Sequence, residues 1–92
     1  MDKKLLQIIN HYGVLPQLKY FQSEVFELNE AIIRAENPYE PIQDIDHITE
    51  ELADCEVMLL QFKEYYHIDG NNILRIMNEK IKRQLKRIEE EK

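Results

Sequence analysis

The chain has 92 residues, with 18 acidic against 12 basic side chains, a formal charge of −6 and a single cysteine, Cys55. Its length predicts one domain over 1–92 with a thin core of its own, and its acidic balance argues against a nucleic-acid binder, which normally has a basic excess. There is no charged-then-apolar leader and no run of ~18 apolar residues, so we expect neither a signal peptide nor a membrane span. A lone cysteine in an apolar run is typical of a small core residue in a reduced, cytoplasmic protein.

Two glycines and three prolines interrupt the helical patterns. Pro16 suits the first turn of a helix, where a missing N–H costs nothing, and the run Asn-Pro-Tyr-Glu-Pro predicts a loop. The predicted helices span about 2–11, 16–36, 43–67 and 71–92. We find no strand pattern, so we predict an all-α fold with three long helices and one short N-terminal helix. The short connections favour antiparallel neighbours and hence a small bundle.

The second helix carries an unusual glutamate. Glu24 shares a face with Tyr20, Phe21, Leu28, Ala31 and Ala35, because positions three and four apart lie on one side of a helix. Glu27 lies about 60° to one side of Glu24, and Glu30 points further round toward water. A surface glutamate would not be placed in the middle of an apolar stripe.

The third helix has a heptad stripe made of Ile45, Ile48, Leu52, Cys55, Leu59, Phe62 and Tyr66. Such spacing predicts a seam that packs along its whole length. A second apolar patch, Ala53, Val57 and Leu60, lies well away from that seam. A helix that is apolar on two sides needs two neighbours, which favours completion of the bundle by a homo-oligomer, either a dimer or a tetramer.

The same helix contains the run EELADCEVMLL, in which carboxylates interrupt an apolar segment. Glu51 and Asp54 flank the seam, and Glu50 is rotated away from it. With Glu24 and Glu27 they form two i,i+3 pairs that face inward. Buried carboxylates repel unless Lys or Arg neutralises them or a cation is bound. Four oxygen ligands without a nearby His/Cys set suit Mg²⁺, with Mn²⁺ as an alternative. The competing interpretation is chance, because a chain with 33% charged residues contains many solvated acidic pairs.

The order Glu24-x-x-Glu27, 23 residues, then Glu51-x-x-Asp54 resembles the motif of the MazG-like all-α nucleoside triphosphate pyrophosphohydrolases. The segments SEVFELNEAI, ITEELADCEVML, QLKYF and NEKIKRQLKRI resemble the family's sequence around its motifs, from about residue 12 to 88. The chain has Ser23 where many members carry the first of two adjacent glutamates. The fourth helix repeats an apolar stripe of Leu74, Met77, Ile81, Leu85 and Ile88.

The resemblance implies hydrolysis of a (deoxy)nucleoside triphosphate to the monophosphate and pyrophosphate, as house-cleaning or nucleotide-pool control. Glu24, Glu27, Glu51 and Asp54 would hold the Mg²⁺, which would neutralise charge between the α- and β-phosphates and activate a water. Glu50 either accepts a proton or supports the metal ligands, or it is a surface residue.

Five more residues are candidates for substrate binding, each with an ordinary structural alternative. Lys80, Arg83 and Arg87 share one edge of the fourth helix and either clamp phosphates or pair with acidic residues of the second helix. Asn78 matches the family's asparagine but is also placed to face solvent. Gln17 either reads a base edge or lies at the core margin.

His47 is the only histidine on the Glu51 and Asp54 face, and we expect it to have no functional role. The alternative to an enzyme is a non-catalytic helical oligomerisation or adaptor module with the same bundle.

Overall fold

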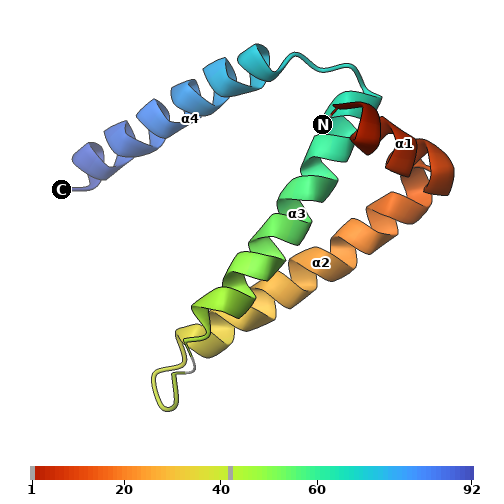
Figure 1. Ribbon diagram of the computed structural model, residues 1–92. Coiled ribbons are helices and arrows are strands. Elements are labelled where there is room, and N and C mark those ends of the chain that lie inside the picture. Colours follow the sequence, from red (N-terminus) through yellow and green to blue (C-terminus); the bar gives the residue numbers. More distant parts are fainter. Residues whose placement is uncertain (1, 42) are drawn as a thin grey trace.

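The regular structure of the protein is entirely helical. The computed structural model describes residues 2–41 and 43–92, and within them there are four helices and no strand (Figure 1). These are α1 (Asp2–Tyr12), α2 (Val14–Ala35), α3 (Ile45–Tyr65) and α4 (Gly70–Glu91). The prediction of an all-α chain with three long helices and a short N-terminal one is confirmed, since the helices contain 11, 22, 21 and 22 residues.

The helix boundaries follow from local chemistry. Gly13 joins α1 to α2 with a φ of 95°, a left-handed conformation that favours glycine. At the start of α3, Asp44 Oδ1 accepts a hydrogen bond from the His47 backbone N–H at 3.0 Å. At the start of α4, Asp69 Oδ1 accepts one from the Asn71 N–H at 2.9 Å. Both aspartates are N-caps, satisfying a backbone donor that the first turn leaves free.

Helices α1, α2 and α3 pack against one another. The loop after α2 returns the chain so that α2 and α3 lie side by side and antiparallel, while α1 covers the end of the pair where α2 begins and α3 ends (Figure 1). The buried apolar side chains are Leu5, Ile9, Ala31, Ala35, Cys55 and Met58. The rings of Phe21 and Phe62 meet edge to face at 5.8 Å between α2 and α3. This small core is consistent with the thin one expected from length.

The heptad seam predicted for α3 is only partly right. Cys55 is buried, but Leu52 and Leu59 are 45% and 53% exposed. The buried face is instead rotated toward Glu51 and Met58, because both α1 and α2 pack on that side of α3. Leu52 and Leu59 of the predicted seam are therefore left largely open to solvent in the described chain.

Helix α4 stands apart from the other three. It runs away from the end of α3 (Figure 1), it packs along none of the other helices in the described parts of the chain, and none of its residues is buried. The expected bundle is thus formed by α1–α3 alone. Since an amphipathic helix gains most of its stability by packing its apolar face, α4 lacks its packing partner in the single chain. No helix among the described residues combines the length and apolar character needed to cross a membrane.

Candidate functional site

Three of the four predicted metal-binding carboxylates meet between α2 and α3. One oxygen each of Glu24, Glu51 and Asp54 lies within 4.8 Å of the others. Glu24 is 5% and Glu51 7% exposed, whereas Asp54 is open to solvent. Glu24 is buried because it lies on the face of α2 that packs against α3, in line with buried Ala31. Two buried carboxylates and one exposed carboxylate therefore form a site with an open side, which we call the acidic cluster.

The buried oxygens of the acidic cluster are not satisfied by the protein. Glu24 Oε2 and Glu51 Oε2 are inaccessible to solvent and have no hydrogen-bond partner. Among residues 2–41 and 43–92, no Lys or Arg forms an ion pair with either side chain or with Asp54. An unpaired buried carboxylate is strongly unfavourable. This arrangement is what a cation with oxygen ligands would stabilise, so the donor set fits Mg²⁺ or Mn²⁺.

The acidic cluster disfavours ionisation of its own members. Burial is the main cause that raises the pKa of Glu24, followed by the neighbouring Asp54 carboxylate. Burial likewise raises the pKa of Glu51, followed by the charge of Glu27. The charge of Glu24 in turn raises the pKa of Tyr20. Like charges and desolvation act in the same direction here, and a bound cation would reverse both.

One positive influence on the cluster comes from His47. Its Nε2 lies 4.0 Å from Glu51 Oε1, one turn earlier on α3, and this neighbour acts to lower the pKa of Glu51, against the larger effect of burial. Because the imidazole is half-exposed, water screens this contact, and Glu51 Oε2 remains without a hydrogen-bond partner.

Glu27 and Glu50 lie outside the set of three. Glu27 is exposed, yet its charge contributes to the raised pKa of both Glu24 and Glu51, so it borders the acidic cluster. Glu50 is exposed and influences none of these groups. The interpretation of Glu50 as a surface residue therefore fits the geometry better than a proton-accepting role.

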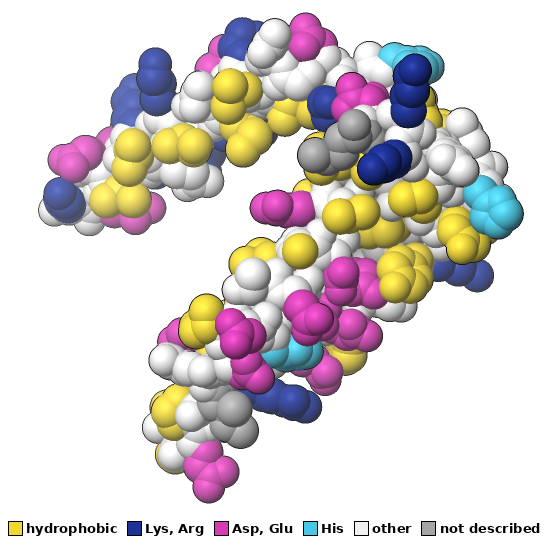
Figure 2. Space-filling view, in the orientation of Figure 1, with side chains coloured by type: hydrophobic (Ala, Val, Ile, Leu, Met, Phe, Trp, Pro, Cys, Tyr) yellow, Lys and Arg dark blue, Asp and Glu magenta, His cyan; other side chains and the backbone are white. Residues whose placement is uncertain are grey.

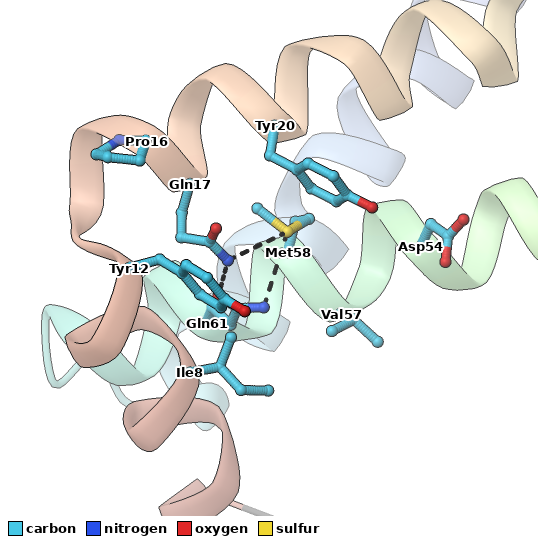
Figure 3. A pocket seen from close by; sticks show the side chains of 9 residues that line it. All are labelled: Ile8, Tyr12, Pro16, Gln17, Tyr20, Asp54, Val57, Met58 and Gln61. Carbon is cyan, nitrogen blue, oxygen red and sulfur yellow. Dashed lines mark hydrogen bonds between the residues drawn. The ribbon is translucent and has the colours of Figure 1, made fainter.

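A cavity of about 490 Å³ adjoins the acidic cluster, and Asp54 belongs to both. Its walls are made by Ile8, Tyr12, Pro16, Gln17, Tyr20, Asp54, Val57, Met58 and Gln61 (Figure 3). Gln17 Nε2 donates a hydrogen bond of 2.8 Å to Gln61 Oε1, and both amide side chains are buried. We call this space the amide pocket. It combines apolar and aromatic walls with a few fixed polar groups, as small-molecule sites do.

Sequence reasoning found Gln17 but missed Gln61, Met58 and Tyr12. The signal was present on α3, where Asp54, Met58 and Gln61 follow the i, i+4, i+7 spacing of one helix face. The predicted heptad stripe lies on a neighbouring side of α3 and includes neither Met58 nor Gln61.

The candidates on α4 are not brought to this site by the single chain. Asn78, Lys80, Arg83 and Arg87 are exposed on a helix that does not pack against α2 or α3. The ion pairs of α4 in the described residues are local ones, Arg75–Glu79 at 3.0 Å and Lys92–Glu89 at 3.1 Å. The structural alternative for the basic edge, pairing with acidic residues of α2, is therefore absent from the described chain.

Comparisons of the chain with protein-family models, with curated proteins and with solved structures gave no match. The resemblance to the MazG-like pyrophosphohydrolases stays a prediction from the motif.

Proposed function

We propose that the protein is a Mg²⁺-dependent hydrolase that converts a (deoxy)nucleoside triphosphate to its monophosphate and pyrophosphate. The observation that carries the proposal is the pair of buried, unpartnered oxygens, Glu24 Oε2 and Glu51 Oε2, beside the open carboxylate of Asp54. Without a cation at this point, the two buried carboxylates would destabilise the folded chain. A bound Mg²⁺ supplies charge neutralisation at the phosphates and activation of water.

In this proposal the triphosphate lies at the acidic cluster and the nucleoside lies in the neighbouring amide pocket. Asp54 is exposed at the edge shared by the acidic cluster and the amide pocket, so it stands where phosphates and nucleoside would meet. The buried amides of Gln17 and Gln61 offer fixed donors and acceptors for a base edge, and the ring of Tyr12 offers a flat apolar surface (Figure 3). The charge of Glu27 raises the pKa of both Glu24 and Glu51, so we propose Glu27 as a fourth ligand at the edge of the site.

A second candidate function is a non-catalytic oligomerisation or adaptor module. The exposed apolar stripe on α4 favours it, because such a face is suited to packing against another chain. It gives no account of the unpartnered carboxylates, so we place it second.

A screen of ribo- and deoxynucleoside triphosphates with Mg²⁺, with product analysis, tests the proposal. We expect pyrophosphate and a monophosphate from at least one substrate, and loss of this activity in Glu51→Gln. Glu30→Gln is the matched control, because Glu30 is exposed on the same helix as Glu24. Orthophosphate as the product, or equal activity in Glu51→Gln, contradicts the proposal.

A further inference from the structure

The two glutamines of the amide pocket are held in one orientation by a methionine. Gln17 Nε2 donates a hydrogen bond of 2.8 Å to Gln61 Oε1 and a weak one to Met58 Sδ at 4.0 Å. Gln61 Nε2 donates to the same sulfur at 3.7 Å (Figure 3). Both amide nitrogens therefore face one thioether, which can accept a hydrogen bond but has no proton to donate.

The opposite orientation of the amide pair would be unfavourable. If Gln61 donated to Gln17 instead, its amide would have to turn over, and its Oε1 would then face the Met58 sulfur. Two acceptors would meet in a place without water, because Met58 is 3% and Gln61 2% exposed. The sulfur of Met58 thus sets the direction of the hydrogen bond between the two glutamines.

This arrangement leaves one acceptor, Gln17 Oε1, free at the pocket. Within residues 2–41 and 43–92, the hydrogen bonds of the Gln17 side chain are those that its Nε2 donates. Gln17 is 9% exposed and Gln61 only 2%, so Gln61 lies deeper in the protein. A ligand would therefore touch Gln17, while Gln61 and Met58 would act through Gln17 as positioning residues.

The surroundings of this acceptor suit a flat ring. Tyr12, at the end of α1, and Tyr20, on α2, line the same pocket with exposed rings, and Ile8 and Val57 add apolar wall (Figure 3). Figure 2 shows apolar side chains at the α1 end of the packed helices, next to acidic side chains over the middle of α2 and α3. A planar ring that lies against the tyrosines keeps its edge available for a hydrogen bond.

We propose that the Gln17 carbonyl selects ligands whose ring presents an N–H donor, and that Gln61 and Met58 make this selection possible by fixing the Gln17 amide. In a nucleobase the donor is an exocyclic amine, as in cytosine and adenine, or a ring N–H, as in uracil. A ligand without such a donor would leave a nearly buried acceptor unpaired, which lowers affinity. The identification of the ring as a nucleobase rests on the proposed function, but the fixed direction of the amide pair does not.

Binding of two uncharged nucleosides tests the selection without metal and without turnover. 5-Methyluridine and 3-methyluridine are isomers of equal size, but only 5-methyluridine retains the N–H of the uracil ring. In an NMR titration of the ¹⁵N-labelled chain, 5-methyluridine should shift the side-chain amide signals of Gln17 and bind roughly tenfold more tightly than 3-methyluridine. Equal affinities, or no shift of these signals by 5-methyluridine at its solubility limit, would overturn the proposal.

Variants of the positioning residues provide a second readout. Met58→Leu keeps the side-chain volume but removes the sulfur, so the amide pair can turn over, and the preference for 5-methyluridine should fall to about twofold or less. Gln61→Leu, which removes the acceptor for Gln17 Nε2, should have the same effect. Met77→Leu makes the Met58 change at an exposed position on α4 and should keep the full preference. A full preference in both pocket variants contradicts the positioning roles.

The outcome separates this inference from the proposed function. Discrimination between the two nucleosides by a chain that hydrolyses no triphosphate would refute the proposed function and leave the selection by Gln17 in place. Hydrolysis of a triphosphate by a chain that binds both nucleosides equally would refute the selection alone.

Discussion

Helices α3 and α4 are nearly equal in length, with 21 and 22 residues, yet they differ in which side chains they bury. Helix α3 buries a charged side chain, Glu51, and a polar one, Gln61, while part of its apolar seam is exposed. Helix α4 buries nothing and exposes its entire apolar stripe. In a self-sufficient domain, both patterns would be reversed.

The difference is the basis of both proposals, a cation at α3 and a protein partner at α4. A buried carboxylate without a partner is stabilised by a cation, and an exposed apolar stripe is stabilised by another protein surface. Helix α4 carries six basic residues between Ile73 and Ile88, whereas no Lys or Arg among the described residues pairs with the acidic cluster. The acidic cluster and the exposed apolar stripe of α4 can be tested separately, so that either proposal can fail alone.

The largest expected effect is on turnover. If Glu24, Glu51 and Asp54 bind one cation, each single change to the matching amide should lower kcat/KM by roughly 100-fold or more. A second change in the same chain should cost little more, because the first has already removed the bound cation. Steady-state kinetics on Asp54→Asn, Glu51→Gln and the double variant measures this.

The control for this comparison is Glu50→Gln, since Glu50 is exposed and adjoins Glu51 in sequence. We expect its activity to stay near that of the unaltered chain. Additive losses in the double variant would mean that the two carboxylates act independently, and the idea of one cation site would be abandoned.

The next effect is on assembly. Ile81→Asp places a carboxylate in the middle of the exposed apolar stripe of α4, where a second chain is expected to pack in the predicted homo-oligomer. Losing one buried isoleucine contact per chain should raise the dissociation constant by roughly tenfold to 100-fold. The neighbouring Lys82→Asp changes the charge further but leaves the stripe intact. Sedimentation profiles that are the same for both variants would remove the stripe from the interface.

The positions of the helices could be predicted from the sequence, because the interactions that begin and end each helix involve residues close together in the chain. Gly13, Asp44 and Asp69 fix helix boundaries through backbone conformation and caps that involve only a few neighbouring residues. Burial of Glu24 was also predictable, because apolar residues precede and follow it on the same face of α2, and that face packs against the rest of the protein. The predicted pair Glu51 and Asp54 lies at the same site as Glu24, with Glu51 buried and Asp54 exposed at its edge.

Packing between helices was not predictable in the same way. Which side of α3 is buried depends on where α1 and α2 both come to lie, so Leu52 and Leu59 were wrongly expected in the core. Gln61 was missed because its partner Gln17 is 44 residues away. The separation of α4 from the other helices was not predicted either, because the periodicity of one helix shows which face is apolar but not which element covers it.

A smaller effect is expected when metal is added. At a Mn²⁺ concentration of 100 times Kd, binding should stabilise the folded chain by about 2.7 kcal/mol, which for this size raises Tm by on the order of 10 °C. Glu51→Gln should show much less of this rise, and Glu30→Gln all of it. Calorimetry at one fixed protein concentration is required, because assembly also shifts Tm. A rise of equal size in all three would place the metal elsewhere.

The smallest effect is the pH dependence of the metal-free protein. Burial raises the pKa of Glu24 and Glu51 in the folded state, so the folded chain retains protons that the unfolded chain has lost. The free energy of unfolding therefore falls as the pH rises from the pKa of the unfolded state, about 4.5, through the higher pKa of the folded state. It is fully recovered below the pKa of the unfolded state.

With a chelator present, lowering the pH from 7 to 5 should raise Tm by a few degrees as a result of these two groups. Glu24→Gln, which removes one of them, should flatten this profile, while Glu30→Gln should leave its slope unchanged. Parallel profiles for the two variants would mean that Glu24 is not the group that takes up the proton.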